Sequence, residues 1–146
     1  MGKKKITTAE TEVKVESAPA PVQATGKSGK RRVDSGILCV ESTYNNTKLV
    51  LTDMKGATLA WASSGNQGFK GAKKGTPFAA AKVGETLADK AATMGVKEVK
   101  VVIKGVGSGR ESAIRGFISK GINLISIQDM TPVPHNGPKP PRPRRN

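Results

Sequence analysis

Residues 77–104, PFAAAKVGETLADKAATMGVKEVKVVIK, decide the fold class because their hydrophobic period changes midway from that of a helix to that of a strand. Thr76 can cap the helix, Pro77 suits its first position, and Gly95 can end it. Beyond Gly95, apolar and charged side chains alternate. The stretch therefore predicts a helix over 77–94 and a strand over 97–104.

Three short β-rich runs precede this unit. They cover residues 36–42, 48–52 and 57–63, and the turn residues Asn45 and Asn46 separate the first two. A second turn lies at residues 53–56. The three runs are predicted to form an antiparallel meander.

One more helix and one more strand follow. Ser108 and Glu111 have the spacing of a capping box, Gly121 can end the helix, and residues 122–128 supply the fifth strand. Strands joined by helical crossovers run parallel. The prediction is a three-layer α/β domain with element order β-β-β-α-β-α-β, helices on the faces of a mixed five-stranded sheet, and the order of the strands across the sheet left open.

Composition excludes several classes of function. The 146 residues are 36 % hydrophobic and 3 % aromatic, enough for one modest core. There is no apolar run of about 18 residues and no signal-like stretch near the start, so we expect a cytoplasmic protein without membrane contact. Cys39 is the only cysteine and His135 the only histidine, which leaves little material for a zinc site or a Ser-His-Asp triad. We expect no enzyme, no metal and no cofactor.

Basic residues outnumber acidic ones in every part of the chain. The net charge is +14, divided as +5 in residues 1–33, +5 in residues 34–129 and +4 in residues 130–146. Composition changes at the same boundaries. We therefore expect a basic disordered N-terminal arm, one α/β RNA-binding domain and a Pro/Arg-rich C-terminal tail, with a polyanion as partner.

The N-terminal arm ends in a basic cluster of Lys30, Arg31 and Arg32, next to the folded domain. Such a cluster is typical of phosphate contacts. For residues 6–25, which contain three glutamates, a purely solubilising role is the alternative.

Six prolines stiffen the C-terminal tail, residues 130–146, toward extended geometry. A stiff basic tail can thread between phosphates, or it can be a proline-rich ligand for an aromatic groove. His135 and Asn136 are candidates for hydrogen bonds or stacking with RNA, with a plain turn as the alternative. The basic candidates are Lys139, Arg142, Arg144 and Arg145.

A glycine-rich connection at residues 64–76 has no apolar periodicity. Lys70, Lys73 and Lys74 can neutralise phosphates there, and Phe69 can stack on a base or plug the core. An ordinary solvated loop is the alternative.

A second glycine cluster occupies residues 104–110, between a predicted strand and a predicted helix. The backbone amides of Gly107, Ser108 and Gly109 are candidates for an anion site, with Arg110 and Arg115 on its flanks. The alternative is a tight strand-to-helix turn without a ligand.

Five motifs follow one another in the chain: YNNT at 44–47, GFKG at 68–71, TPFAA at 76–80, GRESAIR at 109–115 and DMTPVPHNG at 129–137. Over residues 32–145 the sequence resembles the universal small-subunit ribosomal protein eleven family. The resemblance implies a ribonuclease-H-like fold and binding to several small-subunit rRNA helices in the platform, near the messenger exit and the Shine-Dalgarno cleft. It also implies small-subunit proteins seven and eighteen as neighbours and messenger RNA nearby. We count Asn45 and Asn46 among the candidate RNA contacts.

Three interpretations compete. The favoured one is a structural rRNA-binding protein of the small ribosomal subunit that needs no homo-oligomer. A metal-dependent nuclease is the rival, with Glu41, Asp53, Glu85 and Asp129 as candidate carboxylates, although nothing in their spacing makes them converge. A free-standing, non-specific nucleic-acid binder is the third, and it would not sediment with small subunits.

Overall fold

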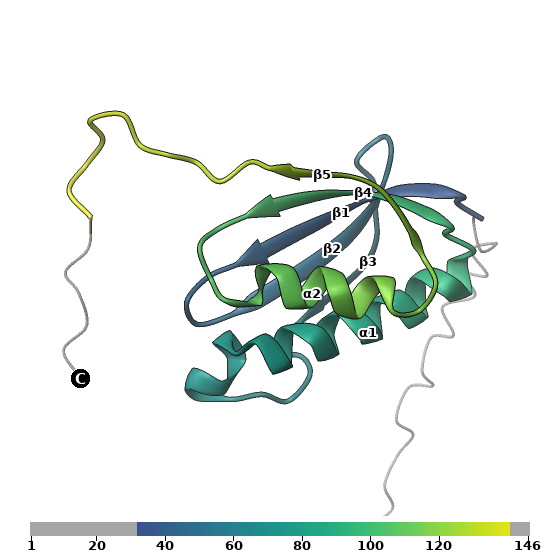
Figure 1. Cartoon of the computed structure of the whole chain (residues 1–146), viewed down its shortest axis with the longest axis horizontal. Coiled ribbons are helices and arrows are strands. Elements are labelled where there is room, and N and C mark those ends of the chain that lie inside the picture. Colours follow the sequence, from purple (N-terminus) through teal and green to yellow (C-terminus); the bar gives the residue numbers. More distant parts are fainter. Residues whose placement is uncertain (1–31, 141–146) are drawn as a thin grey trace, which may run out of the picture.

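The computed structural model describes residues 32–140. Residues 1–31 of the predicted N-terminal arm, with Lys30 and Arg31, and the tail residues Arg142, Arg144 and Arg145 lie outside the described residues. No helix within residues 32–140 is long and apolar enough to cross a membrane. In chain order the elements are β1 (Ser35–Ser42), β2 (Thr47–Asp53), β3 (Thr58–Ser63), the 3-10 helix η1 (Gly71–Gly75), α1 (Pro77–Met94), β4 (Glu98–Lys104), α2 (Gly109–Ile118) and β5 (Asn123–Asp129) (Figure 1).

The five strands form one mixed sheet in the order β3-β2-β1-β4-β5. β1 pairs antiparallel with β2, and β2 pairs antiparallel with β3, which confirms the predicted meander. β4 runs parallel to β1, and β5 parallel to β4, because a helix precedes each of them as a crossover. The central place of β1 is the feature that the sequence pattern left open.

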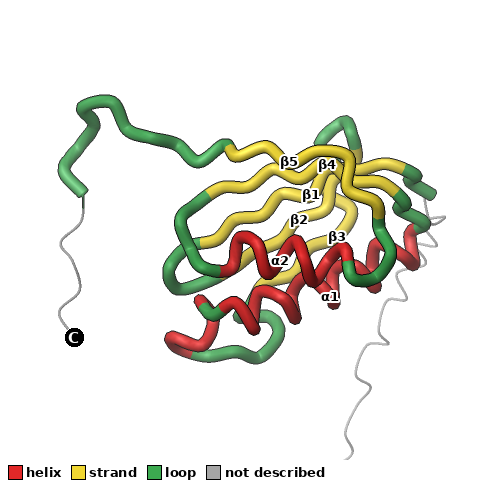
Figure 2. The backbone as a smooth tube through the Cα atoms, viewed as in Figure 1, coloured by secondary structure: helices red, strands yellow, loops and turns green. Residues whose placement is uncertain are grey.

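Both helices cover the same face of the sheet, so the domain has two layers and not the predicted three (Figures 1 and 2). The strands explain why, because β1, β2, β3 and β4 each alternate buried with less buried residues, and β5 has no buried residue. Leu38, Leu49 and Val101 face the helices and are fully or almost fully buried. On the uncovered face Cys39 is half-buried and Trp61 is exposed. One apolar face per strand needs only one helical layer.

The first helix begins and ends as predicted. The Thr76 hydroxyl accepts a hydrogen bond from the Ala79 N–H at 3.3 Å, Pro77 occupies the first turn, and Gly95 closes the helix in the left-handed conformation with φ of 84°. α1 and α2 cross at very short range. A Cβ atom at Gly84 would lie 2.4 Å from the carbonyl oxygen of Ala113, so a side chain there would push the helices apart.

Candidate nucleic-acid interface

Three connections meet at one end of the sheet. β1, β3, β4 and β5 all run in the same direction, so the segments that follow them leave from the same edge. These segments are residues 43–46, 64–76, 105–108 and the C-terminal tail (Figure 2). We call this edge the loop end and the other edge the opposite end. The sequence-predicted residues brought together at the loop end are Asn45, Asn46, Lys70, Lys73, Lys74, Gly107, Ser108, Gly109 and Arg110.

Close backbone contacts join the three connections. The Gly107 N–H donates to the Ser42 carbonyl at 2.9 Å, and the Ser108 hydroxyl donates to the Gly75 carbonyl at 2.9 Å. A Cβ atom at Gly75 would lie 2.1 Å from the Tyr44 carbonyl oxygen. Glycines in these loops therefore allow backbone to approach backbone, and the loop end is a single packed unit.

Three fully buried polar side chains, Ser42, Thr47 and Ser64, support this unit from beneath. The Ser64 N–H and hydroxyl donate to the Thr47 carbonyl at 3.0 and 3.3 Å. The hydroxyl oxygens of Ser42 and Thr47 are 3.5 Å apart. These supporting residues were not predicted, and the only signal for them in the sequence is the presence of small hydroxyl side chains at strand ends.

The connection 64–76 presents its lysines at the surface. Lys70 and Lys73 are exposed and Lys74 is half-buried, and within residues 32–140 none of the three pairs with a carboxylate. η1 within this connection is a turn of helix that the sequence analysis did not predict. Phe69 does not plug the core, because its half-buried ring packs edge to face on the exposed Phe78, with centroids 6.2 Å apart.

The glycine loop, residues 105–108, directs two of its amides inward. The Gly105 N–H donates to the Thr131 hydroxyl at 3.2 Å, and the Gly107 N–H is held by Ser42, so neither is free for a phosphate. Gly107 and Gly109 are buried. The predicted capping box is wrong, because Ser108 has helical backbone angles and its side chain caps nothing. This part of the loop fits the tight-turn alternative.

The two arginines predicted to flank the glycine loop lie apart. Arg110 turns inward, where its Nη1 donates to the Gly105 carbonyl at 3.0 Å and its Nη2 pairs with Asp129. Arg115 is exposed in the last turn of α2 and pairs with Glu111. Arg115 therefore does not flank the glycine loop, because it lies six residues after Gly109, in the last turn of α2.

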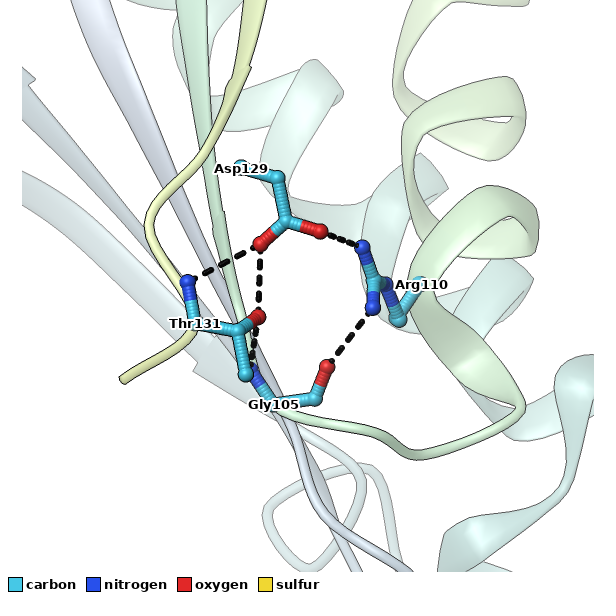
Figure 3. Close-up of polar contacts among 4 residues, drawn as sticks. All are labelled: Gly105, Arg110, Asp129 and Thr131. Carbon is cyan, nitrogen blue, oxygen red and sulfur yellow. Dashed lines mark hydrogen bonds and ion pairs between the residues drawn. The ribbon is translucent and has the colours of Figure 1, made fainter. Parts of the chain in front are cut away.

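Asp129 completes a ring of polar contacts with Arg110, Gly105 and Thr131, which we call the tail anchor (Figure 3). One carboxylate oxygen of Asp129 pairs with Arg110. The other accepts the Thr131 N–H at 2.9 Å and the Thr131 hydroxyl at 2.6 Å. Since Gly105 bonds both Arg110 and Thr131, the ring joins β5, α2, the glycine loop and the start of the tail.

The pKa of Asp129 is lowered from its ordinary value, first by the hydrogen bond from the Thr131 side chain, then by the Thr131 N–H and by Arg110. A lowered folded-state pKa means that the anchor's stabilisation is complete above the ordinary carboxyl range and is lost as the pH falls through the folded-state pKa. We expect the side-chain carboxyl carbon of Asp129 to titrate by NMR below the range of an ordinary aspartate, and Thr131→Val to raise its midpoint. A midpoint in the ordinary range would contradict the contacts described.

The described part of the tail, residues 130–140, contains no helix and no strand. His135, Asn136 and Lys139 are exposed. Asn136 has a φ of 52°, which fits the plain-turn alternative for residues 135–137. Arg32 is also exposed, but it precedes β1 and therefore lies at the opposite end.

Charge distinguishes the two ends. The connecting segments, together with the terminal residues of the elements that they join, differ between the two ends in their numbers of basic and acidic residues. At the loop end these segments hold five bases and one acid, and at the opposite end four bases and three acids. The segments compared are 42–47, 63–77, 104–109 and 129–140 for the loop end, and 32–35, 53–58, 94–98 and 118–123 for the opposite end. The loop end is the more positive and attracts polyanions more strongly.

The candidate carboxylates of a nuclease do not gather. Glu41 and Glu85 each pair with a lysine, at 3.4 and 2.8 Å. Asp53 accepts the N–H of the next residue at 2.6 Å, and Asp129 belongs to the tail anchor. Within residues 32–140 no group of three or more His, Cys, Asp and Glu side chains could hold a metal ion. The geometry does not favour the nuclease.

Together these features define a small basic α/β protein whose loops and tail converge on one candidate nucleic-acid-binding end. A family model described as ribosomal protein S11 matches residues 36–145. The chain belongs to the ribosomal protein S11 family, which confirms the resemblance found in the sequence. This family is structural rather than catalytic.

Several relatives match over most of their length. "Small ribosomal subunit protein uS11" of Thermosynechococcus vestitus is 46 % identical over 128 residues, which are 88 % of this chain and 98 % of the relative. The protein of the same name from Polynucleobacter asymbioticus is 49 % identical over 132 residues, 90 % of this chain and 98 % of the relative. "Small ribosomal subunit protein uS11c" of Trieres chinensis is 50 % identical over 123 residues, 84 % of this chain and 95 % of the relative.

Proposed function

We propose that the chain is a structural component of the small ribosomal subunit that binds rRNA through its loop end and its C-terminal tail. The observation that carries the proposal is the convergence of three connections and the tail, distant in the sequence, on the more positive end of the sheet. Membership of the S11 family gives the chain its location, the small ribosomal subunit in the cytoplasm.

The contacts proposed at the loop end follow from chemistry. Lys70, Lys73 and Lys74 neutralise phosphates, because they are at the surface and pair with no described acid. Asn45 in the exposed hairpin turn offers its amide group to RNA, and the half-buried Asn46 lies beside it. The Oδ1 atom of Asn46 is buried without a hydrogen-bond partner among the described residues.

The tail supplies the second set of proposed contacts. Nine residues follow Thr131 up to Pro140, and at about 3.1 Å per residue a fully extended segment of this length would reach about 28 Å, which the turn at residues 135–137 shortens. His135, Asn136 and Lys139 lie on it, and the arginines at 142, 144 and 145 continue the basic run in the sequence. A compact domain with such a tail can bridge two rRNA helices. The basic cluster of residues 30–32 is proposed as a further contact, and Arg32, its described member, lies at the opposite end.

The finer placement rests on the family resemblance. We propose that the chain lies in the platform near the messenger exit and the Shine-Dalgarno cleft, with small-subunit proteins seven and eighteen and messenger RNA nearby. The ribonuclease-H-like fold and the boundaries at residues 33 and 130 are proposals of the same kind. The strand order β3-β2-β1-β4-β5, with β2 antiparallel to its neighbours, supports the fold.

Replacing Lys70, Lys73 and Lys74 together by alanine should weaken binding to purified small-subunit rRNA about thirtyfold at physiological salt. Each lost phosphate contact removes about 0.7–0.9 from the slope of log K against log salt, so the slope should become shallower by about two. Filter binding at several salt concentrations measures both quantities.

The matched control replaces three lysines of the opposite end, Lys55, Lys97 and Lys120, and so changes the net charge equally. It should alter the affinity and the slope much less. Equal losses in the two variants would contradict the assignment of the loop end, because they would show that only net charge matters.

A further inference from the structure

Within the described part of the C-terminal tail, residues 130–140, only the first two residues are hydrogen-bonded to the folded domain. The Met130 N–H donates to the Ile103 carbonyl at 2.9 Å, and Thr131 is held by the tail anchor. Among the described residues, none from 132 to 140 hydrogen-bonds with the sheet or the helices. Thr131 is therefore the last described tail residue that hydrogen bonds fix to the domain.

The tail anchor includes Gly105, which lies in a loop packed closely against the end of β1. Gly105 has a φ of +102°, and a Cβ atom there would lie 2.1 Å from the Ser42 carbonyl oxygen, so the glycine loop is pressed against the end of β1. The two other contacts of the anchor come from α2 through Arg110 and from β5 through Asp129. Thr131 is thus tied to three elements of the domain and not to a mobile loop.

The prolines that follow Thr131 restrict the backbone of the tail, so the orientation of Thr131 sets the direction in which the tail leaves the domain. Pro132 restricts the backbone of Thr131 to extended conformations, and further prolines stiffen the segment beyond it. The four residues from Thr131 to His135 extend about 12 Å, so a change of about 20° at Thr131 moves the turn at residues 135–137 by about 4 Å. The orientation of one residue therefore decides where the basic part of the tail arrives.

We propose that Asp129 is a positioning residue that aims the C-terminal tail at its RNA, acting through Thr131, Arg110 and Gly105. The inference rests on the proposed function. It also explains why an acid lies at the loop end, since a carboxylate there repels phosphate and weakens binding unless it has another role.

The test compares Asp129→Asn with Glu98→Gln in the full chain, with purified small-subunit rRNA as the probe. Glu98 is an exposed residue at the amino end of β4. Both substitutions remove one negative charge, so electrostatics alone would tighten binding in both. In Asp129→Asn the new amide NH₂ must face either the Arg110 guanidinium or the Thr131 N–H, both of which can only donate. We expect Asp129→Asn to bind rRNA about tenfold more weakly than the unsubstituted chain. The affinity of Glu98→Gln for rRNA should not fall.

Thr131→Val breaks the same anchor without changing the charge, and it keeps the pair of Arg110 and Asp129. We expect a loss comparable to that of Asp129→Asn. Circular dichroism and thermal unfolding report whether each variant is folded. Should Asp129→Asn not fold, Thr131→Val carries the test alone, and unchanged affinity in it would overturn the inference.

In a tail-neutral chain, the four tail bases at 139, 142, 144 and 145 are replaced by alanine. Asp129→Asn and Thr131→Val are then made in this chain and measured at a salt concentration where the tail-neutral chain still binds rRNA. We expect no further loss there, because a tail without charge gains nothing from being aimed. An equal loss with and without the tail charges would overturn the positioning role and leave the proposed function standing. A tail-neutral chain that binds as tightly as the natural one would overturn the RNA role of the tail and the inference with it.

Discussion

Replacing Lys139, Arg142, Arg144 and Arg145 together by alanine is expected to weaken binding to small-subunit rRNA by at least about a hundredfold at physiological salt. These four bases are the whole charge of the tail, which contains no acid. Four lost phosphate contacts at a slope of about 0.7–0.9 each make the salt dependence shallower by about three. Equilibrium binding at several salt concentrations gives the loss and the slope together.

The control for the tail removes four lysines from the domain, Lys55, Lys82, Lys97 and Lys120. Lys82 pairs with Glu85 on α1, and the others lie in connections at the opposite end. This variant has the same net charge as the tail variant, so non-specific attraction falls equally. A tail variant that lost no more affinity than this control would contradict a specific role for the tail.

Gly105→Ala is expected to lower the free energy of unfolding by about 3 kcal/mol. The new methyl group adds two costs. The backbone at residue 105 has a φ of +102°, which strains an alanine, and the Cβ atom would lie 2.1 Å from the Ser42 carbonyl oxygen. Since neither backbone can move without breaking the contacts of the loop end, rRNA affinity should fall as well. Urea unfolding measures the stability.

Gly56→Ala separates the two costs. Gly56 has a φ of +88°, but nothing lies within 4 Å of its Cβ position, so only strain is added. We expect a loss of about 1 kcal/mol and unchanged rRNA binding, since Gly56 lies at the opposite end. Equal losses of stability at Gly56 and Gly105 would show that the close approach to Ser42 contributes nothing.

Local signals were sufficient for the five strands and the two α-helices, but not for η1. Thr76, Pro77 and Gly95 each act at one helix end, and the structure gives α1 the predicted bounds of 77 and 94. The number of layers could not be predicted from the order of helices and strands, because that order does not show on which face of the sheet each helix packs. The alternation within the strands held that information, since one buried face needs only one helical layer.

The candidate site was predictable in its parts and not in its assembly. Lys70, Lys73 and Lys74 could be singled out from composition, but their closeness to the hairpin at 43–46 depends on the strand order, which no local pattern determines. Arg110 was expected to face a phosphate, and its pairing with Asp129 depends on β5 lying beside β4. Contacts between residues far apart in the chain follow from topology, and the sequence left the topology open.

The central claim is that rRNA lies against the loop end and the tail, and a cryo-EM density map of the small ribosomal subunit containing this chain tests it most directly. The account predicts rRNA phosphates within ion-pair distance of Lys70, Lys73 and Lys74, and the tail running between RNA strands from Thr131 onward. A map in which the loop end faces solvent or protein while rRNA covers only the opposite end would contradict it.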